Sequence, residues 1–422
     1  MVFESFTAAA AVVLTSIFVL AFIFGAVANK TNFCTMGAVS DWVNMGDLGR
    51  MRAWLLAIAV AMLGVILFEI FGMVNADGAF PPYRSPQFRW IEHLLGGLLF
   101  GIGMSLASGC GNKILVRVGG GNIKSIMVLL IIAVIAYFMI NPFPGTSHTL
   151  YSTLFYPWMN PLAINLGNQQ DLGSLVAGTE HGAIARLIIG LILAAGVLFF
   201  IFKNADFRRS FDNILGGVVI GLMVVGAWYV TSQAMIDDGF GGQNTLNEYV
   251  QDWDFLADDP DARPAEAAPW SAQSFTFINP MGQSLRYVGS GFDSAVLYIG
   301  VMALVGVILG SLFWALVTKA FRIEWFASVR DFVNHFVGAI LMAFGGVLAM
   351  GCTIGQGITG ISTLALGGFL TFASIVFGAA LTMKIQYYKM LYEDEASFGK
   401  AFLTSLVDMR LLPGKLRKLE AM

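Results

Sequence analysis

Long apolar blocks, separated by short polar segments, run along the whole chain. A helix needs about 20 mostly apolar residues to cross the hydrocarbon core of a bilayer. Blocks of that length lie near residues 5–28, 53–74, 91–107, 123–141, 184–202, 213–236, 292–318, 333–350 and 362–383. The pattern predicts an all-α polytopic membrane protein with about nine transmembrane helices. The first block lacks a basic start and a small-residue cleavage site, so we expect a retained helix rather than a signal peptide.

The composition narrows the class further. Of the 422 residues, 57% are hydrophobic and 12% are charged, whereas soluble domains carry about 25% charged residues. This excludes a soluble globular domain and a disordered chain, and a formal net charge of −3 gives no reason to expect nucleic acid. The three cysteines are odd in number and lie in apolar surroundings, which argues against a disulfide framework. The usual Cys-x-x-Cys metal spacing is missing, and we expect no metal or other cofactor.

The basic residues predict the orientation. With the N-terminus outside, five of the 24 Lys and Arg residues fall in outer segments, namely Arg84, Arg89, Arg186, Arg263 and Arg286. Because basic residues are enriched in cytoplasmic loops, we expect the N-terminus outside and the C-terminus in the cytoplasm. The lipid bilayer is the expected surroundings of the helices.

The chain also repeats itself. Residues 93–110 read HLLGGLLFGIGMSLASGC and residues 335–352 read HFVGAILMAFGGVLAMGC, with a histidine, glycines and a Gly-Cys pair at the same spacing. A weaker copy lies at 213–230, where Val230 stands in place of the cysteine, and the N-terminal block ending at Cys34 is a fourth candidate. Four predicted helices precede the connecting helix at 184–202 and four follow it. The single connecting helix turns the second half upside down, which predicts an inverted-topology repeat (4 + 1 + 4) with a transport site near the midplane.

We therefore expect one membrane transport domain over residues 1–422. Its first half-repeat covers 1–141, and an outer loop and the connecting helix cover 142–212. The second half-repeat covers 213–388 and includes an acidic outer loop at 237–291. Residues 389–422 are the expected cytoplasmic tail.

Three polar, Gly-rich stretches interrupt the apolar helices, at 28–37, 108–122 and 350–360, and each contains one cysteine. Glycine disfavours helix by about 1 kcal/mol relative to alanine, so these stretches predict broken or re-entrant segments. Irregular backbone at membrane depth is tolerated where it is buried in protein or lines a cavity. Such breaks present backbone N–H groups and helix ends, which suit an anion.

Thiols are weak donors with a polarizable sulfur acceptor, so they can hold a soft, sulfur-containing anion without trapping it. The substrate-binding candidates at the breaks are Cys34, Cys110, Cys352, Gly109, Gly351, Lys113, Asn112, Gln356 and Gly355. Weaker candidates are Asn29, Lys30 and Asn32.

Several of these residues have a plainer interpretation. Each cysteine taken singly is compatible with a small buried apolar residue. Lys113 is either functional or extended to the inner interface, and the same interface suits Arg117. His93 and His335 occupy matching positions at helix entrances, which favours capping or interfacial packing. Glu69 lies late in its span and is expected to reach the outer interface.

The segments NKTNFCTMGAVSDW, SGCGNKILVRVGGG and GCTIGQG resemble the three cysteine segments of the YeeE/YedE family of sulfur transport proteins. The resemblance covers roughly residues 10–140 and 213–385. It implies uptake of thiosulfate across the bacterial inner membrane, with no enzymatic activity. It also implies that Cys34, Cys110 and Cys352 line a central path and pass the anion along by S–H···S contacts. A cytoplasmic sulfur-carrier protein is an expected partner of the family.

The chain departs from the family pattern at three positions. Asn32 stands where the first segment usually has arginine, and Ser108 and Lys113 depart from the second segment. These departures leave another soft anion, sulfite or a selenium species, as an alternative substrate. A membrane thiol-redox enzyme is a second alternative, although no close cysteine pair supports it. The sequence is compatible both with a rigid relay and with alternating access.

Overall fold

The computed structural model describes residues 1–237, 242–256, 263–265, 269–392 and 396–420. Within these residues, nine helices are long and apolar enough to cross a membrane. They are α1 (Phe6–Lys30), α3 (Gly49–Ile70), α4 (Trp90–Leu106), α6 (Ile123–Ile140), α9 (Leu172–Phe202), α11 (Phe211–Gln233), α15 (Ile299–Val317), α16 (Val329–Leu348) and α17 (Leu366–Leu391). The prediction of an all-α polytopic membrane protein is confirmed.

Shorter elements connect and cap these helices. Three short helices pack within the bundle or on its faces: α2 (Thr35–Met45), α5 (Gly111–Gly119) and α14 (Ile278–Gly289). The others are α7 (Leu150–Leu154), α8 (Tyr156–Met159), α10 (Ala205–Arg209), α12 (Leu246–Gln251), α13 (Trp253–Leu256) and α18 (Phe398–Asp408). Strand β4 (Met235–Asp237) pairs in parallel with β1 (Val2–Phe3) and antiparallel with β5 (Gln243–Thr245), and β2 (Gln87–Phe88) pairs antiparallel with β3 (Ile164–Asn165).

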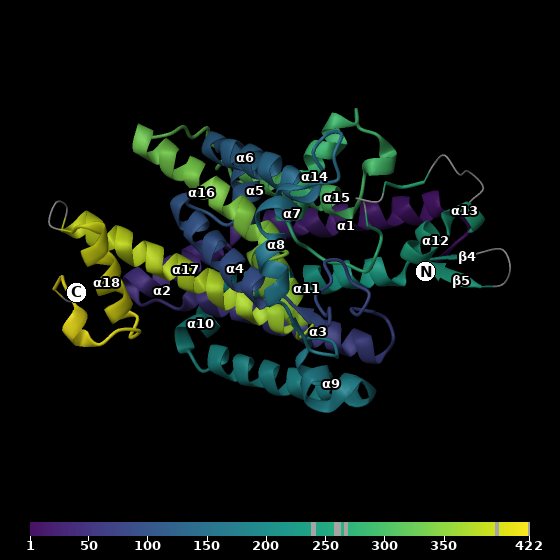
Figure 1. The fold of residues 1–422 in the computed structure, drawn as a ribbon, viewed down its shortest axis with the longest axis horizontal. Coiled ribbons are helices and arrows are strands. Elements are labelled where there is room, and N and C mark those ends of the chain that lie inside the picture. Colours follow the sequence, from purple (N-terminus) through teal and green to yellow (C-terminus); the bar gives the residue numbers. More distant parts are fainter. Residues whose placement is uncertain (238–241, 257–262, 266–268, 393–395, 421–422) are drawn as a thin grey trace.

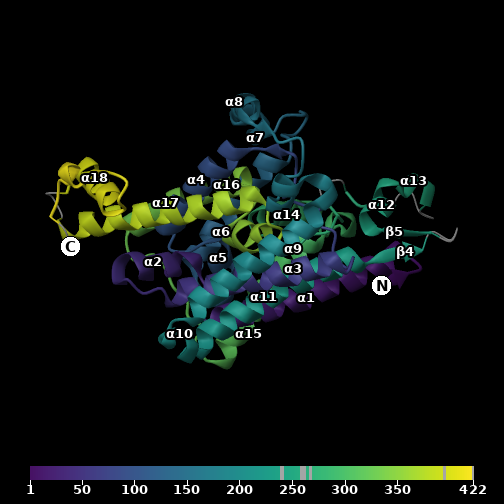
Figure 2. The same ribbon diagram turned by 90° about the horizontal axis from the view of Figure 1, so that it is seen from below.

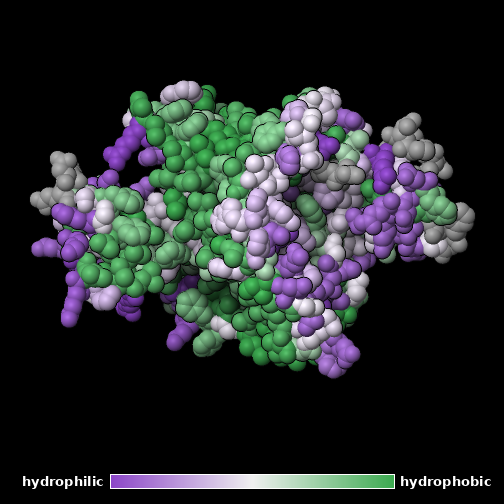
Figure 3. Space-filling view, viewed as in Figure 1, coloured by the Kyte–Doolittle hydropathy of each residue, from purple (hydrophilic) through white to green (hydrophobic). Residues whose placement is uncertain are grey.

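The two ends of the molecule are chemically different from its middle. The N-terminus lies with β4, β5 and α12 at one end, and the C-terminus lies with α18 at the other (Figures 1 and 2). Hydrophobic residues gather on the surface over α6, α16 and α9, whereas hydrophilic residues concentrate towards the two ends (Figure 3). An apolar middle between polar ends is the surface expected of a protein that crosses a bilayer.

Helices α4 and α16, which carry the clearest sequence repeat, cross in opposite directions. A Cβ atom on Gly96 would lie 2.8 Å from the carbonyl oxygen of Gly345, and one on Gly103 would lie 2.6 Å from that of Gly338. The repeat aligns Gly96 with Gly338 and Gly103 with Gly345, so each of these contacts becomes the other when the two segments are exchanged. Glycine at these four positions lets the two backbones approach closely, as is common between membrane helices.

The other helix contacts also match between the two halves of the repeat. Helix α1 packs on α15 as α11 packs on α3, and α4 packs on α17 as α16 packs on α6. The short helix α2 packs on α17, and α14 occupies the matching place on α6. These paired contacts agree with an inverted repeat of four helices on each side of α9.

The segment predicted as an outer loop, 237–291, differs from that expectation. Its last third contains α14, which packs against α6, α15 and α16. Phe275, Phe277 and Ile278 are all at most 2% exposed. These apolar side chains account for the difference, because burying them in the bundle is favourable. Helix α9 is also longer than the predicted span and has a break at Gly178, where φ is 70°.

Candidate functional site

Each of the three cysteines follows the same kind of helix ending. The residue two positions before each cysteine has a left-handed backbone, with φ of 50° at Asn32, 56° at Ser108 and 55° at Met350. The residue just before each cysteine donates its N–H to the carbonyl five residues earlier: Phe33 to Ala28 at 3.1 Å, Gly109 to Met104 at 2.9 Å and Gly351 to Gly346 at 2.8 Å. This is the Schellman motif, which ends a helix and satisfies one of its free carbonyls. The three predicted helix breaks are therefore the same local structure.

A new helix begins at each cysteine. Cys34 and Cys110 are the extended N-cap residues of α2 and α5. The Cys352 carbonyl accepts the N–H of Gln356 at 2.8 Å, at the start of a helical stretch that contains a wide π-helical turn at Gly355–Gly360. The first N–H groups of a helix have no partner within the helix and carry partial positive charge. Three such helix starts therefore coincide with the three thiols.

The three thiols lie close together although they are far apart in sequence. The Cys34 and Cys110 side chains are neighbours. A Cβ atom on Gly111 would lie 3.6 Å from the Cβ of Cys352, and the hydroxyl of Thr353 lies beside the Cys110 thiol. All three cysteines are free thiols and buried. The structure thus brings the three predicted cysteines into one cluster.

The glycines and the glutamine at the breaks are tightly packed against neighbouring groups. A Cβ atom on Gly109 would lie 3.3 Å from the Cβ of Lys113, and one on Gly355 would lie 2.4 Å from the Thr276 hydroxyl. A Cβ on Gly351 would lie 3.2 Å from the Gln356 side chain. The Gln356 amide nitrogen donates to the Ala349 carbonyl at 2.6 Å, so this side chain braces the end of α16. A larger residue at these glycines would separate the segments that hold the thiols.

A cavity of about 400 Å³ opens next to Cys34. Its charged lining residues are Arg50, Lys113, Arg117, Arg322 and Glu324. Basic groups therefore outnumber acidic ones in this lining, although Arg50 is also paired with Asp41. The cavity can attract an anion to the Cys34 side of the cluster.

Lys113 faces this cavity. It is half-buried, and its Nζ donates to the Asn32 Oδ1 at 3.1 Å. Two of the three residues that depart from the YeeE/YedE pattern, Asn32 and Lys113, therefore contact each other. Arg117 also lines the cavity and donates to the Ser108 carbonyl at 2.7 Å.

Of the weaker candidates, Asn29 lines the basic cavity and Lys30 does not. Asn29 lines the cavity and donates to the Ser311 Oγ at 2.8 Å. Lys30 instead pairs with Asp212 at 3.6 Å and lies 5.0 Å from the Phe211 ring centroid. Lys30 is not among the residues that line the cavity.

The paired histidines and Glu69 have packing roles. The His93 Nδ1 lies 2.8 Å from the Thr371 hydroxyl, and the His335 Nδ1 lies 2.8 Å from the Asp331 carbonyl within the first turns of α16. Glu69 lies in the last turn of α3, and its side chain is 13% exposed. It forms a two-pronged ion pair with the buried Arg84, at 2.5 and 2.9 Å.

Sequence reasoning missed several polar residues beside the thiols. Thr35 and Thr353 each follow a cysteine directly and are 0% exposed, so the repeated Cys-Thr pair was an available signal. Thr276 lies against Gly355 but comes from the segment expected to be an outer loop, and no local pattern indicates its position. Within the part of the chain that the structure describes, His, Cys, Asp and Glu form no group of three that could hold a metal ion.

Comparison with known proteins adds a second line of argument. A family model described as "Sulphur transport" matches residues 30–381, which include all three cysteine segments. The thiosulfate transporter TsuA of Escherichia coli (strain K12) is 23% identical over 368 residues, covering 84% of this chain and 90% of that protein. The thiosulfate transporter TsuA of Spirochaeta thermophila is 24% identical over 365 residues, covering 84% of this chain and 93% of that protein.

Proposed function

This chain belongs to the sulphur transport (YeeE/YedE) family, and we propose that it takes up thiosulfate across the bacterial inner membrane. Both relatives are named as transporters, and the chain is a transporter rather than an enzyme. The observation that carries the choice of substrate is the cluster of three free thiols at three helix starts. Helix starts favour negative charge, and thiols suit a soft sulfur atom.

In the proposed path, the anion passes from Cys352 to Cys110 and then to Cys34 through S–H···S contacts. The contacts of Gly111 with Cys352 and of Cys110 with Cys34 support this order. Arg50, Lys113 and Arg117 lie on the Cys34 side of the path and attract the anion there, whereas the thiols are weak donors, so transfer between them stays reversible. The anion then enters the basic cavity next to Cys34.

The proposed orientation has the N-terminus outside and the C-terminus in the cytoplasm. The excess of basic residues in alternate loops supports it, and the basic cavity then faces the cytoplasm. A cytoplasmic sulfur-carrier protein would meet the anion at this cavity.

Growth on thiosulfate as sole sulfur source tests the substrate. The host is a bacterium that lacks its own thiosulfate uptake and carries this chain or an empty vector. We expect growth and uptake of ³⁵S-thiosulfate with the chain and background uptake with the vector. No uptake from a chain shown to be in the membrane would overturn thiosulfate as the substrate. Sulfite and selenite, tested as competitors in the same cells, would then identify the alternative anion.

The charge of Lys113 is expected to matter for uptake. Lys113→Gln should lower the initial uptake rate at low thiosulfate about tenfold, which corresponds to a loss of about 1.4 kcal/mol of attraction for a divalent anion. Lys113→Arg should retain most of the rate because it keeps the positive charge.

The matched control is Lys30→Gln, which removes a basic side chain that is paired with Asp212 and does not line the cavity. Its uptake rate should stay within twofold of the unmodified chain. Equal losses for Lys113→Gln and Lys30→Gln would show that overall basic charge, rather than Lys113, determines the rate.

A further inference from the structure

Several buried polar groups in the thiol segments and in the segment that packs against them have no nitrogen or oxygen partner among the described residues. They are the hydroxyls of Thr35, Thr353, Thr276 and Tyr298, both amide atoms of Asn112 and the amide oxygens of Gln356 and Asn279. An unpaired buried polar group carries a free-energy penalty, so most buried polar groups in folded proteins are paired. A group of unpaired polar atoms beside the three thiols indicates that a polar ligand binds there.

Three of these polar residues each follow one of the cysteines by one or two positions. Thr35 follows Cys34, Thr353 follows Cys352, and Asn112 lies two residues after Cys110. Each lies in the first helical turn that begins at its cysteine, and each is 0% exposed. Every thiol therefore has a nearby hydroxyl or amide in addition to the free N–H groups of the helix start.

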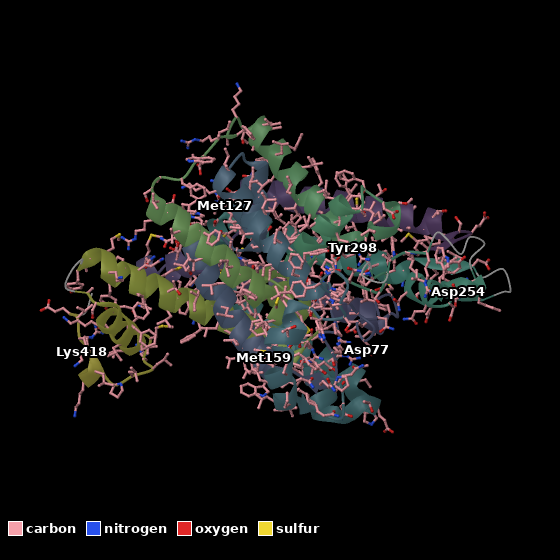
Figure 4. All side chains as sticks on the ribbon, turned by 45° about the horizontal axis from the view of Figure 1, so that its top comes forward. Asp77, Met127, Met159, Asp254, Tyr298 and Lys418 are labelled. Carbon is pink, nitrogen blue, oxygen red and sulfur yellow. The ribbon has the colours of Figure 1, made fainter. Side chains whose placement is uncertain are left out.

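Three further members of this group, Thr276, Asn279 and Tyr298, do not line the basic cavity. Thr276 packs against Gly355 and, with Asn279 and Tyr298, lines a small space of about 10 Å³. This space is about one water molecule in size. Tyr298 lies between the middle of the bundle and Asp254, which marks the end opposite Lys418 (Figure 4). The polar groups thus extend from Thr35 near the basic cavity towards the N-terminal end of the bundle.

Thiosulfate has two chemically different ends, a soft terminal sulfur and a sulfonate with three hard oxygens. Hydroxyl and amide N–H groups donate more strongly to oxygen than thiols do. We propose that Thr35, Asn112, Thr353 and Thr276, here called the oxygen track, bind the sulfonate oxygens while the thiols contact the terminal sulfur. This inference rests on the proposed transport of thiosulfate. The oxygen track would then select anions that carry both a terminal sulfur and sulfonate oxygens.

Replacing Thr353 by valine distinguishes a role in substrate binding from a purely structural role. Thr353→Val keeps the shape of the side chain and removes a hydroxyl that has no nitrogen or oxygen partner and only the weakly accepting Cys110 thiol beside it. Removing a buried polar group with so weak a partner costs the fold little, so the melting temperature of purified protein should stay nearly the same. If the hydroxyl binds the substrate, the initial rate of ³⁵S-thiosulfate uptake should nevertheless fall at least tenfold at low thiosulfate. Thr353→Ser, which keeps the hydroxyl, should retain at least half of the rate.

The matched control is Thr363→Val, eleven residues after Cys352 on the same segment. Thr363 is also 0% exposed, but its hydroxyl donates to the Gly360 carbonyl at 2.8 Å. This variant loses a hydrogen bond, so its melting temperature should fall. Its uptake rate per folded protein should stay within twofold of the unmodified chain.

Thr35→Val, on the separate helix α2, repeats the test if Thr353→Val does not fold. Wild-type uptake by either folded valine variant would overturn the oxygen track. A different result, no thiosulfate uptake by the unmodified chain, would overturn the proposed function itself. Uptake by the unmodified chain and by the valine variants together would keep the transport function and remove this inference alone.

Discussion

Cys110→Ala is expected to reduce thiosulfate uptake to the background of cells without the protein. Cys110 is the middle thiol of the cluster, with the Cys34 side chain as one neighbour and the Cys352 segment as the other. Removing its sulfur leaves a gap that S–H···S contacts cannot bridge. The cost in folding stability should be about 1 kcal/mol, as for removal of one buried methyl-sized group, so the protein should still reach the membrane.

Initial uptake of ³⁵S-thiosulfate, normalised to the amount of protein in the membrane, measures this effect. Cys110→Ser should give an intermediate rate, because a hydroxyl keeps a donor but is less polarizable than sulfur. Ser105→Ala is the matched control: it removes one buried atom near the end of α4, where the serine hydroxyl donates to the Gly101 carbonyl at 3.0 Å. Its rate should stay within twofold. Full uptake by Cys110→Ala would exclude a relay through the central thiol.

Arg84→Met is expected to lower the free energy of unfolding by about 3–5 kcal/mol, the usual effect of breaking a buried ion pair by removing one partner. The Arg84 side chain is 0% exposed. Its guanidinium binds Glu69 at the end of α3, Asp77 at 2.7 Å and the Thr363 carbonyl at 3.0 and 2.9 Å. The residue therefore ties the end of α3 to the segment that follows Cys352. Without it, the Glu69 carboxylate is left largely buried and without its partner.

Thermal unfolding of purified protein in detergent measures this loss. Arg263→Met is the matched control, because Arg263 forms an exposed pair with Asp254 at 3.6 Å and should change the melting temperature little. The double variant Arg84→Met with Glu69→Leu should recover part of the loss, since it removes both buried charges. An unchanged melting temperature for Arg84→Met would show that the ion pair does not hold α3 to this segment.

The sequence alone determined the features that depend on local pattern. Hydropathy over about 20 residues identified the nine spans, and clusters of glycine and polar residues located the three helix breaks. These signals are local because a helix in lipid satisfies its own backbone hydrogen bonds, so its limits follow from the residues it contains. The shared Gly-Cys spacing of 93–110 and 335–352 indicated the repeat for the same reason.

The tertiary structure alone decided which of these residues meet. Cys34, Cys110 and Cys352 belong to three segments separated by long stretches of chain, and their closeness comes from glycine-mediated crossing of helices such as α4 and α16. Likewise, Thr276 reaches Gly355, three residues after Cys352, because the apolar residues around it fold back into the bundle. The burial of Glu69 against Arg84 depends on a partner 15 residues away in an irregular loop. Such contacts are set by how the helices pack, and no periodicity within a single segment encodes them.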